Sequence, residues 1–236
     1  GSLAYDDLET DSGSVKNSLG GSGTFAGLAA AFHTSRRQDP GGTLPLGLVC
    51  AIGEDFDDAD FQLLKDAGLN MGGIETVPGG QTFRWHGKYE GDMAQAITIE
   101  TQQNVLDGYQ PKVPAAWWAP RVLFLANNHP SIQAHVLDQC EGAKYIALDS
   151  MNLWIDIAFE ELSSVMRRIN LAILNDNEVR MIAKDENLIR AGESIRNGEA
   201  LTGGKESGSG PDILIIKKGE HGCLALTDSG MLTLPA

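Results

Sequence analysis

Two polar segments near the end of the chain carry residue types that bind phosphate or magnesium. Asn175–Glu178 (NDNE) follows the apolar run Leu171–Leu174, and its amide and carboxylate oxygens are ligands that suit Mg²⁺. The same segment is a good helix start, because Asn175 or Asp176 can cap it and Glu178 stands about where a capping-box acid stands. The residues alone leave both interpretations open.

Lys217–Gly222 (KKGEHG) follows a second apolar run, Ile213–Ile216. Its glycines permit a tight turn at the carboxyl edge of a strand. Two lysines there would suit the phosphates of a nucleotide, although solvated lysines on a hairpin turn explain the segment equally well.

Near the start of the chain, Asp6 follows a short predicted strand and is joined to Asp7. A carboxylate at the carboxyl end of a strand in an α/β sheet lies where ligands bind. It could accept paired hydrogen bonds from the hydroxyls of a polyol. A solvated turn acid is the alternative.

Gly20–Gly27 (GGSGTFAG) leads into the small-residue run Leu28–Phe32. It contains G-x-G-x-x-A, which occurs in dinucleotide-binding turns and raises the hypothesis of a nicotinamide-dependent oxidoreductase. That hypothesis needs an apolar strand directly before the glycines, whereas Asp11–Ser18 is polar. A glycine-rich helix start also admits a polar ligand close to backbone N–H groups, or simply packs closely.

Composition excludes several classes of partner. Asp plus Glu is 32 and Lys plus Arg is 18, for a net charge of -14. Such a chain repels nucleic acid phosphates and anionic lipid, so we expect neither nucleic acid nor membrane as a partner. No apolar stretch approaches the length that spans a bilayer, and no signal-peptide pattern is present, so the cytoplasm is the expected location.

Short, continuous apolar runs alternate with helical patterns, which predicts an α/β doubly wound fold. The expected strands are Leu46–Ile52, Val122–Ala126, Tyr145–Asp149, Leu171–Leu174 and Ile213–Lys217. The expected helices are Asp57–Ala67, one that begins at Pro130, and Ile155–Ile169.

Two stretches depart from this alternation. Residues 72–101 have short alternating segments and paired glycines, which predict a small antiparallel sheet inserted in the domain as a lid or an interface. Gly203–Gly210 (GGKESGSG) predicts a flexible surface loop.

Taken in order, the motifs resemble those of the ribokinase-like, or PfkB, carbohydrate kinase family, over nearly the whole chain. They are GSLAYD (1–6), GGSGTFAG (20–27), IGEDF (52–56), GGQTFRW (79–85), DSMN (149–152), NDNE (175–178) and KKGEHG (217–222). The resemblance implies a three-layer α/β/α sandwich with a small antiparallel β-sheet lid. We expect one domain over residues 1–236, incomplete at its C-terminus, with the lid at about 72–101.

The resemblance also implies an activity, the transfer of the γ-phosphate of ATP to a hydroxyl of a sugar or nucleoside, assisted by Mg²⁺. By position, the substrate residues are Asp6, Gly20, Gly21, Thr24 and Phe83; the nucleotide residues are Asn175, Lys218, Gly219 and Gly222; and Glu178 is the magnesium residue. Thr24 and Phe25 stand where ribose-binding members have an asparagine, which argues against ribose itself. Lids of this family often pair, so a homodimer through the lid is expected.

One family motif does not occur in the sequence. The family signature ends in D-x-x-G-A-G-D, whose last aspartate is the base that takes the hydroxyl proton, and these 236 residues contain no such segment. Phosphoryl transfer needs a base within hydrogen-bond reach. We therefore assign no catalytic residue, expect this chain to be inactive alone as part of a larger kinase, and keep a non-catalytic sugar- or nucleotide-binding module as the alternative.

Overall fold

The computed structural model describes residues 1–36, 45–91 and 96–236. The chain divides into two compact units, Gly1–Trp117 and Trp118–Ala236. Each unit has its own buried apolar cluster, one around Leu3, Ile52 and Leu64 and the other around Leu148, Leu174 and Leu214. No helix within the described ranges is long and apolar enough to cross a membrane.

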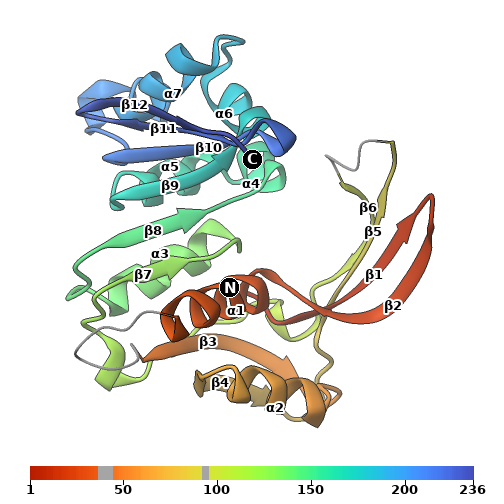
Figure 1. Ribbon diagram of the computed structural model, residues 1–236. Helices are drawn as coiled ribbons and strands as arrows, with labels where there is room; N and C mark the ends of the chain where they lie inside the picture. Colours follow the sequence, from red (N-terminus) through yellow and green to blue (C-terminus); the bar gives the residue numbers. More distant parts are fainter. Residues whose placement is uncertain (37–44, 92–95) are drawn as a thin grey trace. The chain divides into compact units, whose positions relative to one another are not determined.

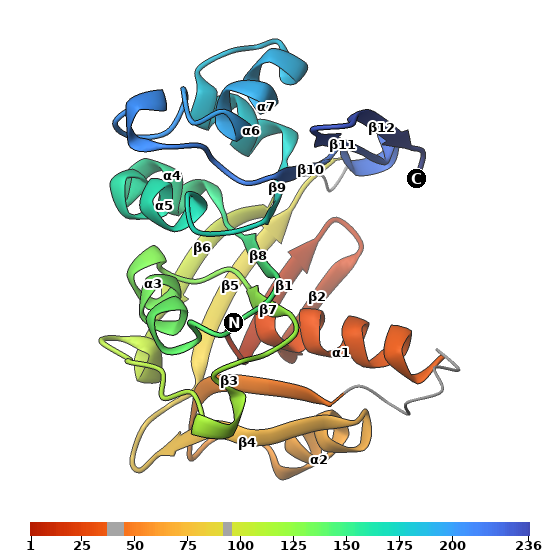
Figure 2. The same cartoon turned by 90° about the vertical axis from the view of Figure 1, so that its left-hand side faces the viewer.

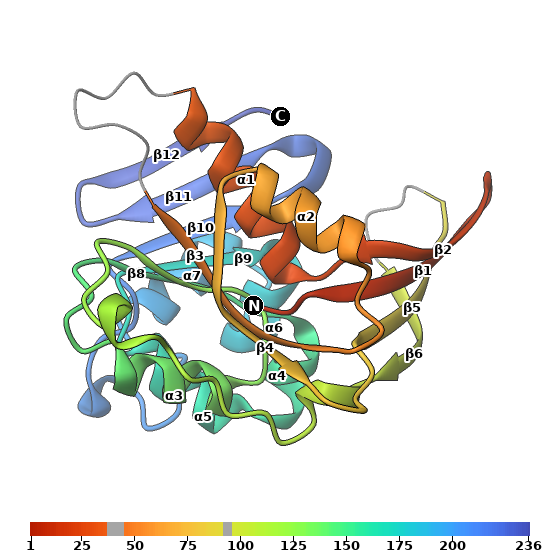
Figure 3. The same ribbon diagram turned by 90° about the horizontal axis from the view of Figure 1, so that it is seen from below.

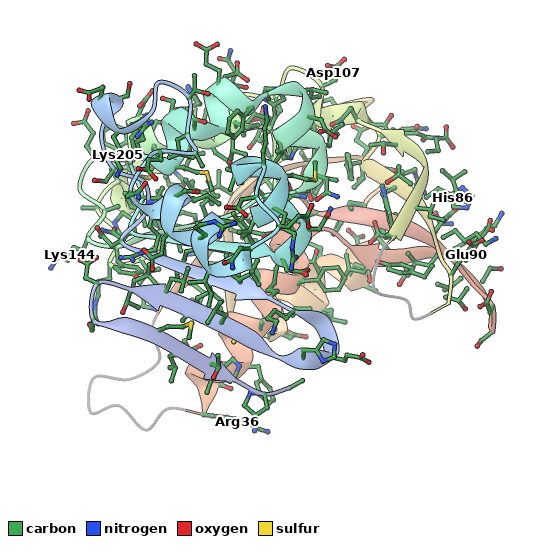
Figure 4. The ribbon with its side chains drawn as sticks, turned by 90° about the horizontal axis from the view of Figure 1, so that it is seen from above. Arg36, His86, Glu90, Asp107, Lys144 and Lys205 are labelled. Carbon is green, nitrogen blue, oxygen red and sulfur yellow. The ribbon has the colours of Figure 1, made fainter. Side chains whose placement is uncertain are left out.

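The first unit contains a small sheet in the strand order β2–β1–β5–β6, which extends away from the rest of the unit in Figure 1. Its strands are β1 (Ala4–Thr10), β2 (Gly13–Gly20), β5 (Phe83–Tyr89) and β6 (Ala96–Gln102). The pair of β5 and β6 is antiparallel, as predicted for this region, and so is the pair of β1 and β2, which was not predicted; the central pair of β1 and β5 is parallel. Figure 4 labels His86 on β5 and Glu90 just beyond the end of that strand.

The rest of the first unit is a parallel pair with two helices. The strands are β3 (Leu46–Gly53) and β4 (Leu69–Val77), and the helices are α1 (Ser22–Ser35) and α2 (Asp58–Asp66). Asp57 is the N-cap of helix α2, and its side chain accepts from the N–H of Ala59 at 2.7 Å. Both helices lie alongside β3 and β4 (Figure 3).

The predicted bounds of the small sheet, residues 72–101, are partly wrong. Its first part belongs to β4, which pairs parallel with β3, and residues 92–95 lie outside the described residues. The hairpin of β1 and β2 supplies the other half of the sheet. The period-2 pattern in 72–77 reflects a strand whose residues are mostly exposed or half-buried, so it does not distinguish an antiparallel strand from a parallel one at an edge.

Hydrogen bonds join the small sheet to the turn that precedes α2. Tyr5 on β1 donates its hydroxyl to Asp60 at 2.9 Å and accepts from the N–H of Asp57 at 2.9 Å. Asp55 accepts from the N–H and the hydroxyl of Thr82, at 2.6 and 2.8 Å, just before β5 begins. These contacts position the two central strands of the sheet.

The second unit has a sheet in the order β12–β11–β10–β9–β8–β7, with β7 to β10 parallel and the β11–β12 hairpin antiparallel (Figure 2). Its strands are β7 (Leu123–Leu125), β8 (Ile146–Asp149), β9 (Leu171–Asn175), β10 (Ile213–Lys217), β11 (Cys223–Thr227) and β12 (Gly230–Leu234). Its helices are α3 (Pro130–Gln139), α4 (Asn152–Ile157), α5 (Phe159–Met166), α6 (Asp176–Ala183) and α7 (Leu188–Arg196). The described residues of the two units also contain short 3₁₀ turns, η1 (Asn104–Leu106) and η2 (Ala115–Trp117) in the first and η3 (Lys205–Ser207) and η4 (Gly219–His221) in the second.

The expected helix Ile155–Ile169 is two helices. Ala158, at φ -139° and ψ 33°, ends α4 and precedes α5. The apolar spacing continues across the break because Trp154 and Ile155 on α4, and Leu162 and Met166 on α5, are all buried. Periodicity therefore located the apolar face but not the interruption.

The expected flexible loop Gly203–Gly210 is held by one arginine. The guanidinium of Arg167 donates to the carbonyls of Gly198, Thr202, Gly204 and Gly208. A planar donor fork satisfies several loop carbonyls at once, which apolar packing cannot do.

Replacement of Arg167 by methionine is expected to lower the free energy of unfolding by roughly 2 kcal/mol, because several carbonyls lose a charged donor. The neighbouring Arg168 offers a matched control, since it pairs with the exposed Asp138 at 2.6 Å. Arg168→Met should cost less than about 1 kcal/mol. Urea unfolding of both variants measures the difference, and equal losses would show that the loop does not depend on Arg167.

Candidate functional site

Polar residues end three neighbouring parallel strands in the second unit. Asp149 is the last residue of β8, Asn175 of β9 and Lys217 of β10. Lys217 Nζ lies 3.3 Å from Asp149 Oδ1, so the ion pair passes over the end of β9 between them. In open α/β sheets, ligands bind outside the carboxyl ends of the strands, which is this edge.

Asn175 and Glu178 form a reciprocal capping box at the start of α6. The Asn175 side chain accepts from the N–H of Glu178 at 2.8 Å, and Glu178 Oε2 accepts from the N–H of Asn175 at 2.7 Å. Asn175 Nδ2 also donates to Glu178 Oε1 at 2.7 Å. The expected helix start is therefore confirmed, with Asn175 as the N-cap.

The carboxylate of Glu178 is unusual for a capping acid because the residue is only 4% exposed. Burial is the main cause that raises the pKa of Glu178 to about 7, and the charges of Asp149 and Asp176 raise it further. The hydrogen bond from the backbone of Asn175 and the charge of Lys217 lower the pKa and offset part of this effect. Burial also raises the pKa of Asp149, which Lys217 partly offsets. This edge thus holds two carboxyl groups whose charges are poorly compensated by the protein itself.

The predicted turn Lys217–Gly222 connects β10 to β11 through η4. Gly219 and Gly222 have φ of 54° and 79°, which favours glycine. A Cβ at Gly222 would lie 2.0 Å from the carbonyl oxygen of Leu234. Lys218 accepts at its carbonyl from the N–H of His221 at 3.0 Å, so the turn is well defined beside the edge that carries Lys217.

In the first unit, the structure brings Asp6, Gly20 and Gly21 together. Asp6 lies within β1, not after a strand as expected, and an ideal Cβ at Gly20 would be 2.0 Å from Asp6 Oδ2. Gly21 precedes α1 at φ 95°, and a Cβ there would be 2.5 Å from the carbonyl oxygen of Ser2. A side chain at Gly20 would therefore collide with the Asp6 carboxylate, and a side chain at Gly21 would collide with the backbone of Ser2, so both positions require glycine.

The environment of Asp6 disfavours its charge. Burial raises the pKa of Asp6 to about 6, and the neighbouring charge of Asp7 adds to this rise. A hydrogen bond from the backbone of Gly21 lowers the pKa and offsets part of it. A half-buried carboxylate of this kind gains from hydroxyl donors supplied by a ligand.

The other two predicted substrate residues have evident structural roles. Thr24 is 1% exposed and donates its hydroxyl to the carbonyl of Gly20 at 2.6 Å, which fixes the backbone of the glycine pair. Phe83 pairs with Ala4 and packs against the core of the first unit. Their contact with a substrate stays a prediction.

Gly20→Ala is expected to displace the Asp6 carboxylate and to cost roughly 1–3 kcal/mol of stability through overpacking. Gly72→Ala is the control, since its nearest neighbour there is the side-chain oxygen of Asn70 at 3.0 Å. Thermal unfolding of the two variants checks the expectation. An unaffected Gly20→Ala protein would mean that Asp6 moves aside without cost.

The dinucleotide turn suggested by Gly21–Ala26 lacks its structural context. The strand before these glycines is β2, which is antiparallel to β1 in the small sheet. A dinucleotide fold needs a parallel strand that feeds the helix. Moreover, the N–H groups of Ser22 and Gly23 at the helix start donate to Ser2, at 3.2 and 2.8 Å.

The sequence did not indicate a role for Asp149, and it indicated Lys217 only as one of two lysines near a phosphate. It placed Trp85 in the lid, where the aromatic residues suggested either the walls of a site or simple packing. Asp149 and Lys217 could have been found, because each ends an apolar run and the ends of parallel strands share an edge. The ion pair between them, across 68 positions, has no local signal.

Comparisons with known proteins identify the fold. No family model matches the sequence, and no curated protein matches it. A nucleoside kinase of Methanocaldococcus jannaschii, a member of the ribokinase family, superposes with a TM-score of 0.69 at 15% identity, covering 100% of this chain and 74% of that one. A nucleoside kinase of Burkholderia thailandensis in complex with inosine gives 0.68 at 15% identity, with coverage of 100% and 74%.

A putative ribokinase II of E. coli, in complex with ATP and Mg²⁺, gives a TM-score of 0.74 at 14% identity, covering 100% of this chain and 76% of that one. The chain therefore has the ribokinase-like, or PfkB, α/β fold, the fold of sugar and nucleoside kinases. At these identities the likeness concerns the fold alone.

Proposed function

We propose that the chain carries the ligand sites of an ATP-dependent phosphotransferase that acts on a hydroxyl of a sugar or nucleoside. One observation carries the proposal: a ribokinase-like sheet gathers Asp149, Lys217 and the buried Glu178 at one edge. Phosphates of a nucleotide need cations there, which Lys217 and a bound magnesium ion would provide.

The residues present fit a magnesium ion. Two carboxyl groups, Asp149 and Glu178, have pKa values raised by burial, which means that their ionised forms are destabilised in the folded protein. A divalent cation beside them would stabilise these ionised forms. Magnesium commonly takes one or two protein carboxylates and completes its shell with water and phosphate oxygens. The ion would neutralise charge on the phosphates, while Lys218, Gly219 and Gly222 would border the nucleotide.

Asp6, with the backbone of Gly20 and Gly21, would hold the hydroxyls of the acceptor. Support comes from the partly buried carboxylate with raised pKa beside two glycines that leave room next to it. Thr24 would act by fixing the carbonyl of Gly20.

We further propose that these 236 residues bind both ligands without completing the transfer, since the sequence contains no D-x-x-G-A-G-D segment to supply the base. A non-catalytic binding module is the second candidate, favoured by the same observation. The expected cytoplasmic location and a homodimer through the small sheet stay predictions.

Calorimetric titration with ATP, with and without Mg²⁺, tests the nucleotide site. We expect binding that requires Mg²⁺ and that is lost in Lys217→Met, whereas the exposed Lys144→Met on the same unit should bind normally. Product assays with a sugar and nucleoside panel should show no phosphorylated product, and turnover would contradict the proposed lack of transfer. Absence of any nucleotide binding would reject the phosphotransferase site, and binding of a sugar alone would then favour the second candidate.

A further inference from the structure

Trp85 lies on the same face of the small sheet as Asp6. The two residues are direct partners in the parallel pair of β1 and β5. Side chains of partnered residues point to the same side of a sheet, and those of adjacent residues to opposite sides. Arg84 and His86, which flank Trp85, therefore belong to the other face, where His86 pairs with Glu9 at 2.9 Å.

The indole of Trp85 lies beside the backbone of Gly87. An ideal Cβ at Gly87 would be 2.0 Å from the ring, so the ring occupies the space that a side chain at 87 would need. Its Nε1 donates to Thr98 Oγ1 at 3.2 Å, and Tyr89 contacts it edge-on, with ring centroids 6.5 Å apart. The ring is thus held by contacts with β5 and β6, and the side chain remains partly exposed.

Core packing does not account for this ring. Phe83, two residues earlier, packs against the apolar core of the first unit, but Trp85 is not part of that core as described. A glycine that makes room for a partly exposed indole on the face of Asp6 suits a ring that stacks on a ligand.

Asp6 and Trp85 lean in opposite directions along the sheet. Asp6 lies over Gly20, which pairs with Ala4, whereas the ring of Trp85 lies over Gly87, which pairs with Leu8. Ala4 and Leu8 are four residues apart on β1, which corresponds to roughly 13 Å of strand. A ligand that contacts both groups must carry hydroxyls at one end and a flat apolar group at the other.

We propose that Trp85 stacks on the planar ring of the substrate and that the acceptor is a nucleoside, not a free sugar. This rests on the proposed function, because Asp6 must hold the ribosyl hydroxyls. A free monosaccharide would contact the carboxylate alone and leave the indole uncovered.

Calorimetry with adenosine, uridine and D-ribose tests the proposal on the wild type, Trp85→Leu and Trp85→Phe. We expect the nucleosides to bind more tightly than ribose, Trp85→Leu to weaken nucleoside binding about tenfold, and Trp85→Phe to retain most of it. Gly87→Ala, which keeps the tryptophan but tilts its ring, should also weaken binding. Trp118→Phe, in the other unit, is the control and should bind like the wild type.

Two failures are distinguishable. Ribose that binds as tightly as the nucleosides, is lost in Asp6→Asn and is indifferent to Trp85→Leu would overturn the nucleoside assignment while the hydroxyl site stands. If none of the three probes binds, the proposed function fails and the assignment fails with it. Circular dichroism of each variant shows that it is folded.

Discussion

Asp6→Asn is expected to weaken acceptor binding roughly 100-fold, because hydrogen bonds from hydroxyls to a carboxylate are stronger than those to an amide. The substitution should not lower the free energy of unfolding. Burial raises the pKa of Asp6 to about 6, so its charge opposes folding at neutral pH. Asp6→Asn should therefore be at least as stable as the wild type, and a loss of binding without a loss of stability marks a ligand-binding residue.

The same group predicts a pH dependence of binding. The ionised carboxylate is the form that accepts from hydroxyls, so wild-type affinity should fall as the pH is lowered through about 6. The affinity that remains in Asp6→Asn should not change over this range. Calorimetric titrations between pH 5 and 8 measure both.

Asp7→Asn provides the matched control. Asp7 points to the opposite face of β1 and accepts from the N–H of Asn17 at 2.8 Å. Its charge contributes to the raised pKa of Asp6, so removing it should keep acceptor binding at neutral pH and move the midpoint to lower pH. An unmoved midpoint, or equal loss of binding in both variants, would contradict the assignment.

Glu178→Gln is expected to weaken binding of ATP with Mg²⁺ by about tenfold or more, since a charged ligand oxygen near the ion is lost. Glutamine serves in a capping box as glutamate does, so the start of α6 should be retained. The variant thus separates the charge of Glu178 from its role as a cap. Binding of ATP with Mg²⁺ as tight as in the wild type would leave capping as its whole role.

The stability of the variant should also differ in a defined pH window. Burial raises the pKa of Glu178 from 4.5 to about 7, so the folded state holds its proton more tightly than the unfolded state. The contribution of this group is fully present below pH 4.5 and is lost as the pH rises through about 7, a change of roughly 3 kcal/mol. Above pH 7, Glu178→Gln should be more stable than the wild type.

Urea unfolding at pH 4.5 and pH 8 checks this expectation, with the exposed Glu160→Gln at the start of α5 as control. The control should follow the wild-type dependence. Magnesium should act in the opposite sense, because a cation beside Glu178 favours its ionised form and restores stability at high pH. A wild-type stability that does not vary between these pH values would show that Glu178 titrates normally.

Local patterns were sufficient for the parallel strands. The run Ile213–Lys217 is strand β10 with the same bounds, and the helix expected from Pro130 begins there. Continuous apolar runs mark strands that are covered on both faces, and proline at the first helical position fixes a helix start. The capping box at Asn175 could also be predicted from the sequence, because its hydrogen bonds join residues only three positions apart.

Local sequence patterns did not predict the strands that are buried on one face only, or the pairing of strands that are distant along the chain. The hairpin of β1 and β2 is mostly polar and half-exposed, so it was not recognised, and Asp6 was placed at the end of a strand rather than within one. Residues 72–77 were assigned to the small sheet, although their partner is β3, about 24 positions earlier. Partner choice between strands depends on long-range packing that a local window does not contain.

The sequence by itself determined the alternation of strands and helices, the glycine pair at 20 and 21 and the helix cap at Asn175, because each depends on neighbours along the chain. Only the tertiary structure decided that Lys217 reaches Asp149, that the carboxylate of Asp6 lies over Gly20, and that the ring of Trp85 lies over Gly87 on the face of Asp6. Those contacts arise from strand order and register, and register sets which side chains share a face.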